Sequence, residues 1–90
     1  MSEEKKYSLE EAIELYENDA YEEAMRAFRQ HKKNMDAQYY IGMMYYEGFG
    51  VPKDLEEAKR WFKKASRQGS LDAQYMMLCC EGTTSACCKG

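Results

Sequence analysis

All four cysteines of the chain lie in its last twelve residues, as the adjacent pairs Cys79–Cys80 and Cys87–Cys88. Four thiolates are ligands that Zn²⁺ or Cu⁺ accepts, so a small metal-handling protein is one hypothesis. Adjacent cysteines lack the Cys-x-x-Cys spacing that normally directs two sulfurs to one metal. The simpler interpretation is that Cys79 and Cys80 pack as small apolar residues of a last helix, while Cys87 and Cys88 belong to a frayed tail. We therefore expect no cofactor and keep the metal site as an alternative.

Other residues with catalytic chemistry are few. His31 is the only histidine, and in the repeat described below it corresponds to Ala65, so we interpret it as a structural or surface residue. No Ser-His-Asp group, phosphate-binding glycine loop or carboxylate pair in an apolar context can be assembled. Four glutamates recur at helical spacing, where a solvated helix face is a simpler interpretation than a metal site: Glu10, Glu11, Glu14 and Glu17. We expect no catalytic residues and a protein that is not an enzyme.

A repeat organises the chain. Residues 36–39 and 72–75 have the same sequence, Asp-Ala-Gln-Tyr, at a period of 36 residues. Periods of this size are typical of helical pairs that cannot bury an apolar face alone and stack on copies of themselves. Such chains usually act as binding surfaces, so the repeat favours a binding protein over a catalyst.

Two amphipathic helices are predicted within one period. Residues 36–47 place apolar or small residues at i, i+3, i+4, i+7, i+8 and i+11, namely Ala37, Tyr40, Ile41, Met44, Tyr45 and Gly48. Residues 55–67 have a similar stripe, namely Leu55, Ala58, Trp61, Phe62 and Ala65. Asp54 is placed to cap the second helix and Gly69 to end it. We expect Trp61 and Phe62 to be the principal core residues of this pair.

Weaker helical signals lie on both sides. Residues 8–11 form a capping-box pattern that opens a helix, and a turn at Asn18-Asp19 leads into a second one. Residues 71–80 predict a fifth helix whose apolar stripe comprises Leu71, Ala73, Met77 and Leu78. Between the central helices, residues 48–52 supply the backbone freedom of glycine and the rigid proline that a tight return requires.

Residues 37–69 resemble the Sel1-like repeat, a relative of the tetratricopeptide repeat. The residues that match the family pattern, in its order, are Ala37, Gly42, Tyr45, Gly48, Gly50, Val51, Asp54, Ala58, Trp61, Lys64, Ala65 and Gly69. The resemblance covers one complete repeat with partial repeats on both sides. It implies an all-α fold, a short right-handed α-solenoid of about five antiparallel helices, and adaptor-like binding of a protein or peptide.

The same family has a cysteine-rich secreted branch, in which cysteines eight positions apart staple the helices. Cys79/Cys87 and Cys80/Cys88 have this separation, so disulfides are a third interpretation of the cluster. These pairs follow the first helix of a repeat, however, and do not join successive helix pairs. Hydrolase activity has been claimed in that branch, but the chain offers no nucleophile and base to support it.

Tyrosine and methionine are abundant, with eight and seven residues, and they suggest where a partner binds. Tyr39, Met43 and Tyr46 form a second stripe on the helix of residues 36–47, and Tyr75 repeats Tyr39 one period later. Because the first helices of stacked pairs line the concave surface, we expect these four residues to form a ladder there. Tyr and Met suit partner contacts, although the same side chains could instead close the core.

Charge and composition limit the remaining functions. We divide the chain into a disordered N-terminus (1–6), a helical repeat domain (7–80) and a cysteine-containing tail (81–90). The net charge of −3 disfavours nonspecific nucleic-acid binding. No apolar run approaches the roughly 20 residues that cross a bilayer, and no apolar segment follows Met1 as in a secretory signal. We expect a cytoplasmic protein without nucleic-acid or membrane partners, and self-association stays open.

Overall fold

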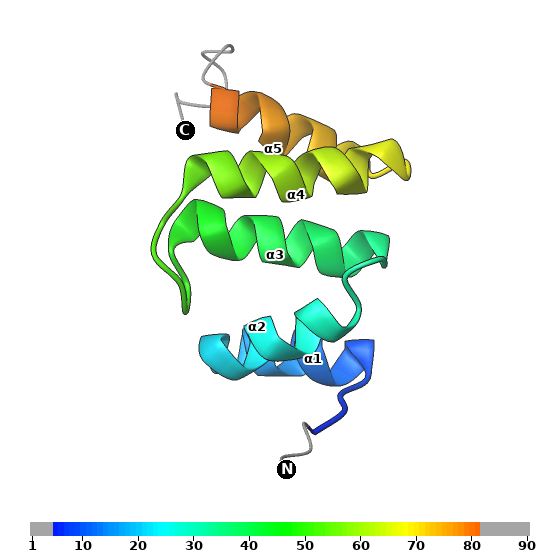
Figure 1. The fold of residues 1–90 in the computed structure, drawn as a ribbon, viewed down its shortest axis with the longest axis vertical. Coiled ribbons are helices and arrows are strands. Elements are labelled where there is room, and N and C mark those ends of the chain that lie inside the picture. The colour runs from blue at the N-terminus through cyan, green and yellow to red at the C-terminus, as the bar shows by residue number, and fades with distance from the viewer. Residues whose placement is uncertain (1–4, 82–90) are drawn as a thin grey trace.

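The structure, a computed structural model, describes residues 5–81. In this range the chain forms five helices and no strand: α1 (Leu9–Glu17), α2 (Tyr21–Gln30), α3 (Met35–Glu47), α4 (Leu55–Arg67) and α5 (Leu71–Glu81). The helices stack along the long axis of a body of 47 × 24 × 22 Å, with α1 and α2 at one end and α5 at the other (Figure 1). The predicted all-α fold, a short solenoid like that of tetratricopeptide repeats, is confirmed.

The predicted capping box and the predicted turn both occur in the first helical pair. The Glu11 amide donates to Ser8 Oγ at 3.1 Å, and the Ser8 amide donates to Glu11 Oε1 at 2.9 Å, which completes the capping box. The turn that follows α1 places Asp19 at φ 65°, a left-handed conformation that Asp tolerates better than most residues. Helices α1 and α2 pack against each other, and Ala12 and Phe28 are buried.

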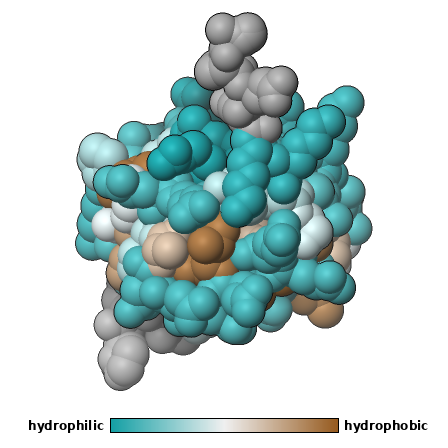
Figure 2. Space-filling view, turned by 90° about the horizontal axis from the view of Figure 1, so that it is seen from below, coloured by the Kyte–Doolittle hydropathy of each residue, from teal (hydrophilic) through white to brown (hydrophobic). Residues whose placement is uncertain are grey.

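The segment 5–8, which we call the strap, lies extended against the end of α2. The side-chain amide of Gln30 holds it twice, accepting from the Tyr7 amide at 2.9 Å and donating to the Lys5 carbonyl at 2.6 Å. The Tyr7 hydroxyl donates to Glu23 at 2.6 Å, and His31 Nε2 lies 2.7 Å from the Tyr7 carbonyl oxygen. The disorder expected for residues 1–6 stays a prediction, and for Lys5 the contact with Gln30 argues against it. This end of the molecule is mostly hydrophilic, with a small apolar patch at its centre (Figure 2).

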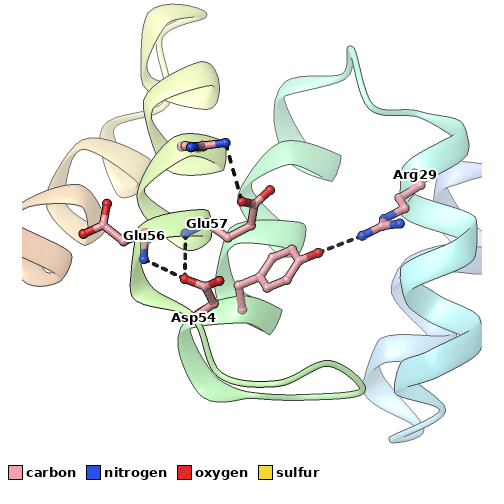
Figure 3. Close-up of polar contacts among 6 residues, drawn as sticks. Arg29, Asp54, Glu56 and Glu57 are labelled. Carbon is pink, nitrogen blue, oxygen red and sulfur yellow. Dashed lines mark hydrogen bonds and ion pairs between the residues drawn. The ribbon is translucent and has the colours of Figure 1, made fainter.

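The turn between α3 and α4 also contacts the first helical pair. Gly48 and Gly50 have φ of 79° and 75°, as a tight return requires. Phe49 between them stacks on Tyr21 of α2 with ring centroids 4.4 Å apart. Asp54 then caps α4, as predicted, because its side chain accepts hydrogen bonds from the backbone amides of Glu56 and Glu57 (Figure 3).

Two buried clusters make up the core of the described residues. The larger joins α1, α2 and α3 and comprises Ala12, Ala24, Met25, Ala27, Phe28, Ala37, Ile41 and Met44. The smaller joins α4 and α5 and comprises Ala58, Phe62, Ala65 and Ala73. Tyr45 packs against both clusters, and its hydroxyl accepts a hydrogen bond from Arg29 of α2 at 2.7 Å (Figure 3).

Two predicted core assignments are wrong. Trp61 is only half-buried: it packs against the larger cluster, and Lys64 Nζ lies 4.3 Å from the centroid of its ring. Phe62 alone is the fully buried aromatic residue of α4, because Gly42 leaves space for its ring on α3.

On α5, Leu71 and Leu78 point to solvent, with 75% and 43% of their surface exposed. These leucines lack a covering helix among the described residues.

Candidate protein-binding surface

Charge is segregated between the helices. The odd-numbered helices α1, α3 and α5 contain acidic residues and no Lys or Arg: Glu10, Glu11, Glu14, Glu17, Asp36, Glu47, Asp72 and Glu81. All bases in the helices belong to α2 and α4: Arg26, Arg29, Lys59, Arg60, Lys63, Lys64 and Arg67. The odd-numbered helices, which open each pair, therefore carry negative charge only.

A row of tyrosine rings crosses from α1 to α3. The ring centroids of Tyr16 and Tyr40 are 5.1 Å apart in an edge-on arrangement, and those of Tyr40 and Tyr39 are 5.8 Å apart. Tyr39 continues the row to α4, where its centroid lies 5.9 Å from that of Phe62. All three tyrosines are half-buried, so each has one side in the protein and one side in water.

Carboxylates of three helices act electrostatically on this row. Burial raises the pKa of the Tyr40 hydroxyl, and Glu17 of α1 and Asp36 of α3 raise it further. Burial likewise raises the pKa of Tyr39, with a further contribution from Asp72 of α5. The carboxylates that act on the phenol groups in this way come from α1, α3 and α5. We call this surface the acidic tyrosine face, defined by Tyr16, Tyr39, Tyr40, Glu17, Asp36, Glu47 and Asp72.

Glu47, at the end of α3, belongs to the same face. The pKa of the Tyr16 hydroxyl is raised mainly by burial and then by Tyr21, Glu47 and the two other tyrosines of the row. Tyr40 was expected in an apolar core stripe, and neither it nor Tyr16 was predicted as a surface residue. The one signal that could have indicated them is the absence of any base on α1 and α3.

The four predicted partner-binding residues occupy two different environments. Tyr39, Met43 and Tyr46 are half-buried and pack against the smaller core cluster, so the prediction that they lie apart from the core is wrong. The reason is that α4 and α5 both approach this side of α3. Tyr75 lies on α5 with 53% of its surface exposed. The structure therefore does not gather all four into one exposed ladder.

The cysteine cluster is described only in part, because Cys87 and Cys88 lie outside the described residues. Cys79 is disulfide-bonded, and Cys80 is half-buried against the smaller core cluster. Among residues 5–81, no three side chains of His, Cys, Asp or Glu are placed to hold a metal ion. His31 contacts the strap and has a structural role at the end of α2.

The comparison with protein families agrees with the fold. The model of the Sel1 repeat matches residues 36–70, which include α3, the glycine turn, α4 and the loop that follows. No solved structure matches the chain significantly. In the described part of the chain, the longest helices are too short and too polar to cross a bilayer. Sel1 repeats generally mediate protein–protein interactions and are typically not catalytic. The chain therefore contains one segment that matches a Sel1 repeat, with further helices on both sides of it.

Proposed function

We propose that the protein is a non-catalytic adaptor that binds a protein or peptide on the acidic tyrosine face. The observation that supports this most is the row of half-buried tyrosine rings on α1 and α3, two helices that carry acids and no Lys or Arg. Tyrosine offers a large, stiff contact area with a polar tip, and such residues often contribute most of the energy of an interface. Tyr39, Met43 and Tyr46 contribute their exposed edges.

The charge of the face defines the chemistry of the partner. A surface with acids and no bases attracts a segment that is rich in Lys and Arg and repels an acidic one. The carboxylates would select the partner and accelerate the encounter, while the rings would supply the buried area. Binding should therefore weaken as the salt concentration increases. The cytoplasmic location expected from the sequence suits an adaptor and stays a prediction.

A site-specific photo-crosslinking experiment tests the proposal. A photoreactive phenylalanine replaces Glu17 or Glu47, both exposed on the acidic tyrosine face, or Glu56, exposed on α4, as the control. In an extract of the cells that produce the protein, we expect one or few proteins to crosslink from the first two positions and not from the third. Binding of the purified partner should then weaken in Glu17→Lys/Glu47→Lys and stay unchanged in Glu22→Lys/Glu56→Lys. Equal crosslinking from all three positions would reject this face as the binding site.

A further inference from the structure

One side of α5 is apolar and exposed. Leu71, Tyr75 and Leu78 follow each other at i, i+4 and i+7, the spacing of a continuous helical stripe, and 75%, 53% and 43% of their surfaces are exposed. The opposite side of α5 packs against the smaller core cluster through Ala73, Met76, Met77 and Cys80. We call the exposed residues Leu71, Tyr75 and Leu78 the outer stripe of α5.

The repeat shows what this side of a helix normally contacts. Shifted by one period of 36 residues, the outer stripe corresponds to Met35, Tyr39 and Gly42 of α3. Met35 and Tyr39 pack against the smaller cluster, and Gly42 is covered by Phe62 of α4. On α3, the second helix of the pair therefore covers this side. On α5, no described element does so.

The two ends of the stack differ in this respect. At the α1–α2 end, the strap lies over the helices, Tyr7 packs against the larger core cluster, and the surface is mostly hydrophilic (Figure 2). Repeat proteins need such polar caps at their ends to stay soluble. The outer stripe of α5 is not a polar cap, since its most exposed residue, Leu71, is apolar.

We propose that the outer stripe of α5 is a docking site for a basic amphipathic helix of a partner protein. Helix α4, which covers the equivalent side of α3, carries five bases and two acids, whereas α3 and α5 carry acids only. A partner helix with the charge of α4 is therefore complementary to α5. A second copy of α5 is not, because a symmetric contact would bring like-charged helices together, and the whole chain has a net charge of −3.

The shape of the stripe restricts the partner further. A Cβ atom at Gly42 would already lie 2.7 Å from two ring carbons of Phe62. Leu78 holds the equivalent position on α5, and its whole side chain occupies the space that Phe62 uses on α3. A docking helix must therefore carry a small residue, such as Ala, opposite Leu78. This requirement distinguishes the partner from a further copy of α4.

The experiment uses the full chain and a synthetic helix based on α4. The probe is a fluorescent peptide of residues 55–67 with Phe62→Ala, stapled on its outer side so that it is helical. We expect it to bind, and to bind at least about 10-fold more tightly than the same peptide with Phe62, because the ring would clash with Leu78. Leu71→Glu in the protein should weaken binding by about 10-fold or more. Leu55→Glu, at an exposed leucine of α4, is the matched control and should have no effect.

Further measurements separate the alternatives. Because Leu71 is 75% exposed, Leu71→Glu should keep the helical circular dichroism of the parent protein. Undetectable peptide binding, or binding that Leu71→Glu does not change, would overturn the proposal. So would light scattering that shows a dimer of the parent protein and a monomer of Leu71→Glu, since a second copy would then be the occupant. Glu17→Lys, which tests the acidic tyrosine face, should not change peptide binding, so this inference and the proposed function can fail independently.

Discussion

The ring of Phe62 lies so close to Gly42 that a Cβ atom on Gly42 would be 2.7 Å from two ring carbons. This contact sets how closely α3 and α4 approach, because a larger residue at either position would push the helices apart. Phe62 belongs to the smaller cluster, and both residues lie in the segment that the Sel1 repeat model matches. The contact also explains why Phe62, and not its neighbour Trp61, fills the space between the helices.

Gly42→Ala should destabilise the protein even though Ala is the better helix former by about 1 kcal/mol. The added methyl group overpacks the contact with Phe62, and we expect a net loss of about 1–2 kcal/mol in urea unfolding. In a Phe62→Leu background the same substitution should cost less, because the smaller side chain leaves space for it. Equal costs in both backgrounds would show that the ring is not the limiting neighbour.

Gly50→Ala should be more harmful than Gly69→Ala. Both glycines have positive φ, 75° and 108°, so both substitutions should incur backbone strain of about 1 kcal/mol or more. A Cβ atom on Gly50 would also lie 2.9 Å from the backbone carbon of Tyr21, whereas one on Gly69 would meet no atom within 4 Å. We expect the melting temperature to fall clearly further for Gly50→Ala. Similar values for the two variants would mean that the turn moves away from α2 without cost.

The sequence allowed the local features to be predicted well, because they depend on residues close in the chain. Asp54 caps α4 and the Ser8–Glu11 pair caps α1, as their types and spacing indicated. The local sequence could not indicate which of two adjacent aromatic residues is buried. Trp61 and Phe62 are both on the inner half of α4, and the choice depends on Gly42, which is twenty residues from Phe62.

The candidate site was less predictable for the same reason. Leu71 and Leu78 have the pattern of core residues, but burial requires a covering helix that a pattern within α5 cannot reveal. The contacts of the strap could not be predicted either, because Gln30, which accepts from the Tyr7 amide, is 23 residues from Tyr7. Tyr16 and Tyr40 form part of a surface only because α1 and α3 lie together. Side chains that meet across helices are fixed by packing, which periodicity alone does not determine.

Phe62→Ala should destabilise the protein more than Trp61→Ala, although Trp is the larger residue. Phe62 is fully buried, and its removal should leave a cavity that costs about 3–5 kcal/mol. Trp61 is half-buried, so part of its surface already contacts water, and the loss should be smaller. Chemical denaturation of both variants measures the difference. The opposite order would indicate that α4 is rotated from the orientation described.

Gln30→Ala should release the strap without unfolding the helices. The Tyr7 amide, which donates to Gln30 Oε1 at 2.9 Å, should lose protection from hydrogen exchange. The neighbouring Ser8 amide donates to Glu11 at 2.9 Å and should stay protected, which makes it an internal control. Since the bond is exposed, stability should fall by only about 0.5–1.5 kcal/mol. Unchanged exchange at Tyr7 would show that other contacts hold the strap.

Alkaline pH should destabilise the protein through the tyrosine row. The pKa of Tyr16 is raised from 10.0 mainly by burial, and those of Tyr39 and Tyr40 are raised for the same leading reason. In the unfolded chain these phenols ionise near pH 10.0, while in the folded protein they keep their protons to higher pH. Between these values the unfolded state binds fewer protons, so the free energy of unfolding falls as the pH increases. Their contribution to stability is complete below pH 10.0 and is lost as the pH passes the folded-state pKa.

Urea unfolding at a series of pH values should show this decline, and Tyr16→Phe should make it less steep because one ionisable phenol is removed. Tyrosinate absorbance followed in the folded protein should show the row ionising later than the unfolded chain. A decline of equal slope in the parent protein and in Tyr16→Phe would mean that Tyr16 does not titrate differently in the two states. In that case the hydroxyl of Tyr16 would not be buried in the folded protein as described.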